Sequence, residues 1–208
     1  MSLRTDEVFD LVRAVSDYWH QNIQPEVLPN ACILASRYAS ELLTYFGIEN
    51  SVLPVAVVAC NDPMLEFLTT TDGVPPFPDG AWSVGVGVPN TKAEIYPKGD
   101  GWNGHAVVIT RSFYVDLTAP QMDRPKYNIV SGGSLIAEIA EMRTSPLIDG
   151  WNYIQLPQGH YSWRQTNDAK YKDSKDWNST YKLFTGNAIR SIRKDFGQLL
   201  TNHQTREQ

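Results

Sequence analysis

Residues 104–118, with the sequence GHAVVITRSFYVDLT, form the stretch that decides the fold. Apolar and β-branched residues dominate both halves of this stretch, and a break at 111–112 separates them. The pattern predicts a β-hairpin with strands at 105–110 and 113–117. One histidine, His105, begins the first strand, and one aspartate, Asp116, lies near the end of the second.

The register of this hairpin decides whether His105 and Asp116 meet. A two-residue turn at 110 and 111, or a four-residue loop at 109–112, places the two residues directly opposite each other on one face. A turn centred at 111 and 112 makes them diagonal neighbours on one face, still within reach of a hydrogen bond. Only a three-residue loop without a bulge would separate them. The alternative is that each is satisfied locally at its own strand end.

Two helices are predicted before this hairpin. Residues 5–19 carry apolar side chains at spacings of three and four, which indicates an amphipathic helix. A second helix is predicted from Asn30, a good N-cap, to a stop at Gly47. Cys32 then falls at the second helical position, where unpaired backbone N–H groups and the helix dipole favour a thiolate. A lone cysteine on an apolar stripe is also commonly only a packing residue.

Further strands are expected around the hairpin. A β-branched run at 52–59 predicts a buried strand, and alternation predicts strands at 82–88 and 151–156. Gly85 and Gly87 share one face of the strand at 82–88, which indicates close approach by another backbone or surface.

The remaining segments are helices and loops. A short helix is predicted at 134–143 and a closing helix at 187–201. Loop excursions are expected at 61–80 and 89–104, where proline, glycine and other turn formers collect. Residues 161–178 mix polar, aromatic and charged side chains and give no clear assignment. The class expected is α+β, as a single domain over residues 1–208.

Composition bounds the class of protein. The 42% hydrophobic and 20% charged content is typical of a soluble globular chain, and the net charge of -5 argues against nucleic acid or an anionic membrane as main partner. No apolar run suits a signal peptide or a membrane span, so a cytoplasmic location is expected. Only Cys32 and Cys60 occur, which excludes a cysteine-rich zinc site and leaves one bridge between them open. Neither a metal nor a cofactor is expected.

Cys32, His105 and Asp116 together are a candidate catalytic triad. His105 would take the thiol proton of Cys32, and Asp116 would fix the His105 tautomer and stabilise its imidazolium form. Attack on a carbonyl gives an oxyanion, which the backbone N–H of Cys32 and one side-chain donor would stabilise. The candidate donors precede the cysteine and are Gln24, Gln21 and, more weakly, Trp19.

The other three histidines are weaker candidates for the base. His20 and His203 lie in polar helix-end settings, and His160 lies in a turn. Each is expected to be solvated, with His160 as the reserve base.

These motifs resemble the transglutaminase-like branch of the papain-like cysteine enzymes. The resemblance covers roughly residues 30–121. The segments that carry it are Asn30-Ala31-Cys32 opening a helix, Leu42-Leu43 to Gly47-Ile48 leading into the strand Val52 to Val58, Gly104-His105-Ala106-Val107, and Val115-Asp116-Leu117-Thr118-Ala119-Pro120-Gln121. It implies a papain-like fold in which the catalytic helix packs on an antiparallel sheet, with Cys32 as nucleophile and a thioester intermediate. Members often carry an aromatic residue after the His-Ala pair, where this chain has Val107.

Three functions fit the sequence. The first is a cysteine-dependent hydrolase or acyltransferase on a peptide, protein or small amide or acyl substrate, with hydrolysis favoured because water needs no acceptor pocket. The second is a non-catalytic binding or assembly protein on the same scaffold. The third is an amine-accepting transferase, whose product formation would rise with added amine. Aromatic residues that could line a cleft, although such residues are more often core or rim, are Trp102, Tyr96 and Trp82.

Overall fold

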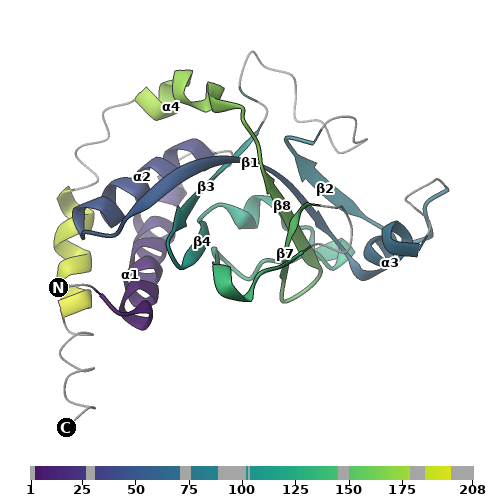
Figure 1. Cartoon of the computed structure of the whole chain (residues 1–208), viewed down its shortest axis with the longest axis horizontal. Coiled ribbons are helices and arrows are strands. Elements are labelled where there is room, and N and C mark those ends of the chain that lie inside the picture. The colour runs from purple at the N-terminus through teal and green to yellow at the C-terminus, as the bar shows by residue number, and fades with distance from the viewer. Residues whose placement is uncertain are drawn as a thin grey trace, which may run out of the picture.

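The computed structural model describes residues 3–26, 31–70, 76–88, 102, 104–144, 150–178 and 186–197. In this part of the chain the protein is mixed α and β, with a curled antiparallel sheet and helices around it (Figure 1). The strands are β1 (Asn50–Cys60), β2 (Ser83–Val86), β3 (His105–Thr110), β4 (Phe113–Asp116), β5 (Leu135–Glu138), β6 (Arg143–Thr144), β7 (Asn152–Gln155) and β8 (His160–Gln165). Their order is β5-β4-β3-β1-β8-β7-β6, with β2 also paired to β1. The predicted α+β class is confirmed.

Strand β1 is the axis of the sheet. Its first half pairs with β3, which sets Val55 opposite His105, and its second half pairs with β2 on the same edge. Strand β8 pairs along the other edge. Where β2 leaves β1, a Cβ on Gly87 would lie 3.2 Å from the Val55 carbonyl oxygen, and the φ of Gly87 is +70°. The close backbone approach predicted for the glycines of this strand is therefore confirmed.

Helices α1 (Thr5–Tyr18) and α2 (Cys32–Tyr45) pack side by side against one face of the sheet (Figure 1). The helix at 186–197 packs on the same core. These observations confirm the helices predicted at 5–19 and from 30 to 47, and the described part of the helix predicted at 187–201. Buried residues of this first core include Leu11, Val15, Ala35, Leu42, Val108, Val115 and Ile192.

A second core fills the inside of the curl. It includes Val57, Val107, Tyr114, Tyr161 and Trp163. Because side chains alternate along a strand, His105 shares its face with Val107, and Asp116 shares its face with Tyr114. The hairpin therefore directs His105 and Asp116 to the inside of the curl, on the face opposite Val108 and Val115.

The excursion predicted at 61–80 is wrong in its first part, which forms helix α3 (Asp62–Thr70). Asn61 begins this helix by accepting a hydrogen bond from the Met64 N–H at 3.2 Å. Pro63 stands in the first turn, where no backbone N–H is needed. Met64 and Phe67 then pack against Cys60. The Asn-Asp-Pro signal is therefore a helix start rather than part of a loop.

The short helix predicted at 134–143 is also wrong. Residues 135–138 form β5, which pairs with β4, and a 3-10 turn (Ile139–Glu141) leads to β6. The helical spacing of apolar residues was overridden by pairing to the free edge of β4. Residues 161–178, which received no assignment, contain most of β8, a 3-10 turn (Ala169–Asp173) and α4 (Lys175–Asn178).

The loop predicted at 89–104 lies almost entirely outside the described residues, and so does Tyr96. Among the residues that the structure describes, no helix combines the length and apolar character needed to cross a membrane.

Candidate active site

Cys32 is the first residue of α2. The N-cap is Ala31, with φ -89° and ψ 27° and no side-chain cap bond. The prediction that Asn30 is the N-cap and Cys32 the second helical residue is therefore wrong by one position, and Asn30 itself lies outside the described residues. Cys32 nevertheless stays in the first turn, where backbone N–H groups lack intrahelical partners and the positive end of the dipole lies.

A hydrogen bond anchors this end of α2 to the hairpin. The Ser36 hydroxyl, one turn after Cys32, donates to the Ala106 carbonyl oxygen at 2.7 Å. Ala106 follows His105 directly in β3. The bond therefore fixes the helix start against the strand that carries the histidine.

The hairpin turn lies at 111–112. Val108 pairs with Val115 and Ile109 with Tyr114, so His105 and Asp116 are diagonal neighbours, the second of the predicted arrangements. The Thr110 hydroxyl accepts hydrogen bonds from the N–H groups of Phe113 at 2.8 Å and Ser112 at 3.2 Å. This local bonding closes the turn and so sets the register that joins the two side chains.

His105 and Asp116 form a buried pair. Nε2 of His105 lies 2.8 Å from Oδ2 of Asp116, and the side chains are 3% and 0% exposed. Cys32 lies close enough to the same histidine for its side chain to raise the pKa of His105. Because Nε2 faces Asp116, Nδ1 is the ring nitrogen left for the thiol. The structure thus brings together all three residues of the predicted triad, from one helix and two adjacent strands.

Electrostatics favour an ionised histidine and aspartate. Burial alone disfavours the imidazolium, but the Asp116 carboxylate, its hydrogen bond and Cys32 together raise the pKa of His105 to about 10. Burial also opposes ionisation of Asp116. However, His105 and hydrogen bonds from Tyr161 and Thr118 hold the pKa of this carboxyl below its usual value. The arrangement is therefore suited to an imidazolium next to the Cys32 sulfur.

Asp116 accepts four hydrogen bonds. Oδ1 accepts from the Thr118 backbone N–H at 2.9 Å and from the Thr118 hydroxyl at 3.0 Å. Oδ2 accepts from His105 and from the Tyr161 hydroxyl at 2.8 Å. Sequence reasoning missed both partners. The spacing Asp-Leu-Thr carries the signal of an Asx turn for Thr118, whereas nothing in the sequence pointed to Tyr161.

The three candidate oxyanion donors have different surroundings. Trp19 is fully buried, its ring centroid lies 5.4 Å from that of Tyr38, and its Nε1 has no hydrogen-bond partner among the described residues. Gln21 is exposed. Gln24 is held through its Oε1 by Nδ1 of His20, so the amide nitrogen of Gln24 is the end left to donate.

His20 also contacts the second half of the chain. Its Nε2 lies 2.6 Å from the Ser134 hydroxyl, which lies 3.4 Å from the Leu117 carbonyl oxygen beside Asp116. The expectation that His20 is solvated is therefore wrong. Its contacts hold Gln24 on the side of the fold where β4 ends.

The candidate cleft residues are separated. Trp102 packs against a cluster of Cys32, Ile33 and Tyr171, 5.4 Å from the Tyr171 ring centroid. A Cβ on Gly104 would lie 2.3 Å from the Trp102 ring, so the residue before His105 must be glycine for this packing. Trp82 lies elsewhere: it stacks on Tyr127 at a centroid distance of 4.0 Å, in the second core.

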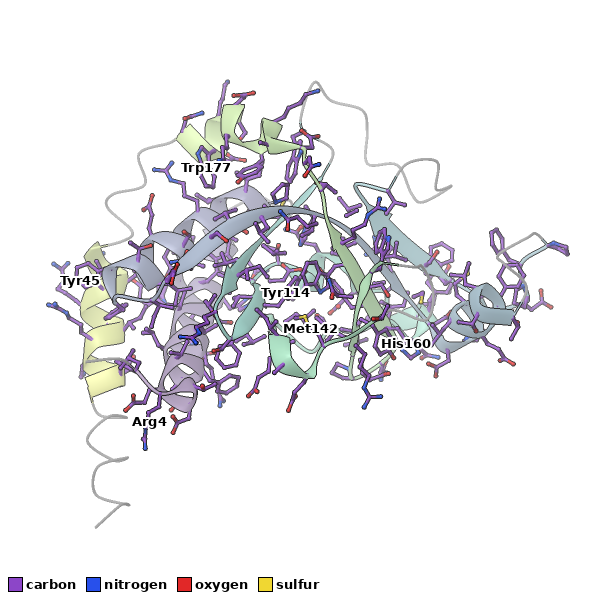
Figure 2. All side chains as sticks on the ribbon, viewed as in Figure 1. Arg4, Tyr45, Tyr114, Met142, His160 and Trp177 are labelled. Carbon is purple, nitrogen blue, oxygen red and sulfur yellow. The ribbon has the colours of Figure 1, made fainter. Side chains whose placement is uncertain are left out.

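His160, the reserve base, belongs to another cluster. Its Nε2 bonds Asp62, its Nδ1 lies 2.6 Å from the Tyr153 hydroxyl, and it is buried rather than solvated as expected. His160 pairs with Cys60 on β1, whereas His105 pairs with Val55 on the same strand. These two positions on β1 are five residues apart, which is about 17 Å along the strand. Burial and Asp62 raise the pKa of Cys60 to about 12. Figure 2 shows His160 on the α3 side of the sheet.

Both cysteines are free thiols. Within the described ranges, no three His, Cys, Asp or Glu side chains are grouped to hold a metal ion. A cavity of about 610 Å³ lies beside Met142, a residue labelled in Figure 2. Its lining includes Phe9, Phe113, Ile136, Glu138, Met142 and Tyr153, and no triad residue.

The fold and the site together define a buried cysteine, histidine and aspartate constellation on a mixed α and β scaffold. No protein-family model, curated protein or solved structure matches the chain.

Proposed function

We propose that the protein is a cysteine-dependent hydrolase or acyltransferase that acts on an amide or acyl substrate through a thioester. The observation that carries this proposal is the continuous contact from the Cys32 thiol through His105 to Asp116. A histidine that holds a positive charge at neutral pH favours the thiolate form of a cysteine beside it. We include in the proposal the papain-like fold, which the packing of α2 on an antiparallel sheet supports.

In the proposed reaction Cys32 and His105 start as a thiolate and imidazolium pair, in which the former thiol proton is on Nδ1 of His105. The thiolate then attacks the substrate carbonyl, and the carbonyl electron pair moves to oxygen to form a tetrahedral oxyanion. When the oxyanion collapses, the bond to the leaving group breaks and His105 returns its proton to that group. Water, activated by the same histidine, then hydrolyses the thioester and restores the thiol.

Two donors are proposed for the oxyanion. The backbone N–H of Cys32 lies in the first turn of α2 and has no intrahelical acceptor. The Gln24 amide is the second, because His20 holds its oxygen and leaves the nitrogen to donate. Peptides, proteins and small amides remain the proposed substrate class. A cytoplasmic location is part of the proposal, since the thiol must stay reduced.

A second candidate is a non-catalytic binding or assembly protein. The observation that favours it is the burial of Cys32, which is 8% exposed beneath aromatic neighbours. In that case the histidine and aspartate would stabilise the core and the thiol would only pack.

The test is to trap the acyl-enzyme with an activated ester and locate the added mass by peptide mass spectrometry. The proposal expects one acyl group on Cys32, none on Cys60, and none in His105→Ala. If loss of the acyl group from Cys32 becomes faster with added amine, the acceptor is an amine. If the acyl group is lost in water alone, the reaction is hydrolysis. No acylation of folded protein by any of a panel of esters and amides would favour the binding protein.

A further inference from the structure

Two buried tyrosines extend the hydrogen-bonded chain beyond Asp116. The Tyr161 hydroxyl lies 2.8 Å from Oδ2 of Asp116, and the Tyr114 hydroxyl lies 2.9 Å from that of Tyr161. The two side chains are 1% and 0% exposed. Figure 2 shows Tyr114 inside the curl of the sheet. The proposed catalytic chemistry does not use either hydroxyl directly.

The direction of these hydrogen bonds follows from counting donors. An ionised carboxylate only accepts, so the Tyr161 hydroxyl donates its one proton to Asp116. The Tyr161 oxygen then accepts from Tyr114. Burial, and after it the charge of Asp116, raises the pKa of each tyrosine well above the usual value, so both remain protonated donors. The chain therefore runs from Tyr114 to Tyr161 to Asp116, and each bond polarises the next in the same sense.

This contact depends on the curl of the sheet. Tyr114 and Asp116 belong to β4 and Tyr161 to β8, and β3 and β1 lie between these two strands. In a flat sheet, strands three positions apart are about 14 Å from each other, beyond the reach of two hydroxyls. The curl turns β4 and β8 to face across the second core, so β8 reaches the triad from the part of the chain outside the family resemblance.

A buried carboxylate depends on its donors. Asp116 lies 1% exposed among apolar side chains, so water cannot replace a donor that is removed. Among the described residues, Oδ2 receives hydrogen bonds from His105 and Tyr161 alone, whereas Oδ1 receives both Thr118 groups. In the described part of the chain, Tyr161 is thus the one group besides the base itself that fixes the oxygen facing His105.

We propose that Tyr161, supported by Tyr114, is a positioning residue that keeps Asp116 ionised and its Oδ2 directed at His105. The inference rests on the proposed function, because its consequence is a stable imidazolium beside Cys32. Tyr161 does not contact the reacting atoms, so it acts through Asp116 alone.

The test uses Tyr161→Phe and Tyr114→Phe, which keep the rings and remove only the hydroxyls. The pH profile of Cys32 alkylation by iodoacetamide is measured for each, with folding checked by near-ultraviolet circular dichroism. In Tyr161→Phe the carboxylate loses a charge-assisted bond, so Asp116 protonates at higher pH. The low-pH limb of the alkylation profile therefore shifts to higher pH by about one unit. Tyr114→Phe shifts it in the same direction by less, because its bond is one step removed.

The matched control is Tyr38→Phe. Tyr38 is also a buried tyrosine, yet its hydroxyl has no hydrogen-bond partner within the described residues. Loss of the Tyr38 hydroxyl is expected to leave the pH profile of Cys32 alkylation unchanged. Suppose that Cys32 of the wild-type protein shows activated alkylation and that Tyr161→Phe and Tyr114→Phe give the same pH profile as the wild type. The inference is then overturned, while the proposed function stands.

A second readout separates the two claims. The 13C NMR signal of the Asp116 carboxyl carbon reports its protonation without any reaction at Cys32, and the inference expects its midpoint to rise in Tyr161→Phe. If wild-type Cys32 shows no activated reaction, the proposed function fails. The carboxyl titration then decides the inference: a raised midpoint retains the tyrosine support of Asp116, and an unchanged midpoint overturns it.

Discussion

Replacing Asp116 by asparagine tests the electrostatics of the site through the stability of the protein. The pKa of His105 is about 10 in the folded chain, against about 6.5 for an ordinary histidine. Below pH 6.5 the imidazolium forms in both states and its favourable pairing with Asp116 is fully present. As the pH rises toward 10, only the folded chain keeps the proton, so this contribution to the unfolding free energy is lost.

The magnitude follows from linkage. One extra proton in the folded state lowers the unfolding free energy by about 1.4 kcal/mol for each pH unit. Between pH 6.5 and 9 the predicted loss is therefore about 3 kcal/mol. Asp116→Asn removes the charge that raises the pKa of His105. The fall of the unfolding free energy with pH over this range therefore disappears. The variant is also less stable at pH 6.5, by about 3 kcal/mol, because a buried pair has lost one partner.

The assay is guanidinium unfolding followed by tryptophan fluorescence, at pH values from 6 to 9. Both proteins carry Cys32→Ala, which removes the titration of that thiol from the comparison. It also removes the smaller contribution of Cys32 to the pKa of His105, so the loss in this background is somewhat below the value worked for the wild-type chain. Cys60, with its pKa raised to about 12, adds its own loss above pH 8.5 to both proteins and cancels in the difference. Equal slopes for Cys32→Ala with and without Asp116→Asn would refute the reasoning.

Two further predictions concern residues around the triad. Gly104→Ala places a methyl group 2.3 Å from the Trp102 ring and is expected to displace that ring and shift the tryptophan emission spectrum. Gly186→Ala, where nothing lies within 4 Å of the added Cβ, is the control and should leave the spectrum unchanged. Gln24→Ala is expected to slow acylation by about 10²-fold or more, as the loss of an oxyanion donor does. Because alkylation by iodoacetamide forms no oxyanion, the same variant should leave that rate unchanged, and Gln21→Ala should leave both rates unchanged. Equal acylation rates in the two glutamine variants would exclude Gln24 as the donor.

The hairpin was predictable because its interactions are local. Apolar patterning fixed the two strands, and side-chain alternation placed His105 and Asp116 on one face in either of two registers. The choice between those registers depends on Thr110, whose hydroxyl closes the turn. The approach of Cys32 to His105 was predicted from the position of Cys32 at the start of a helix. The predicted N-cap, Asn30, was one residue too early, an error that is common at helix ends.

The rest depends on long-range packing that short patterns do not encode. Residues 135–138 fit a helical spacing, and only the free edge of β4 makes them a strand. Tyr161 lies 45 positions from Asp116 in sequence, and the sheet must curl before the two can bond. His20 and His160 were expected in solvent for the same reason, since their partners Ser134 and Asp62 come from distant segments.

The most direct test of the central claim is the alkylation rate of Cys32 with iodoacetamide as a function of pH, read by peptide mass spectrometry. Cys60 is the internal control, because it is fully buried and burial raises its pKa to about 12. The account predicts fast modification of Cys32 that persists well below the value of about 8.5 for a free thiol and is lost in His105→Ala. Modification that follows an ordinary thiol, or that is identical without His105, would contradict it.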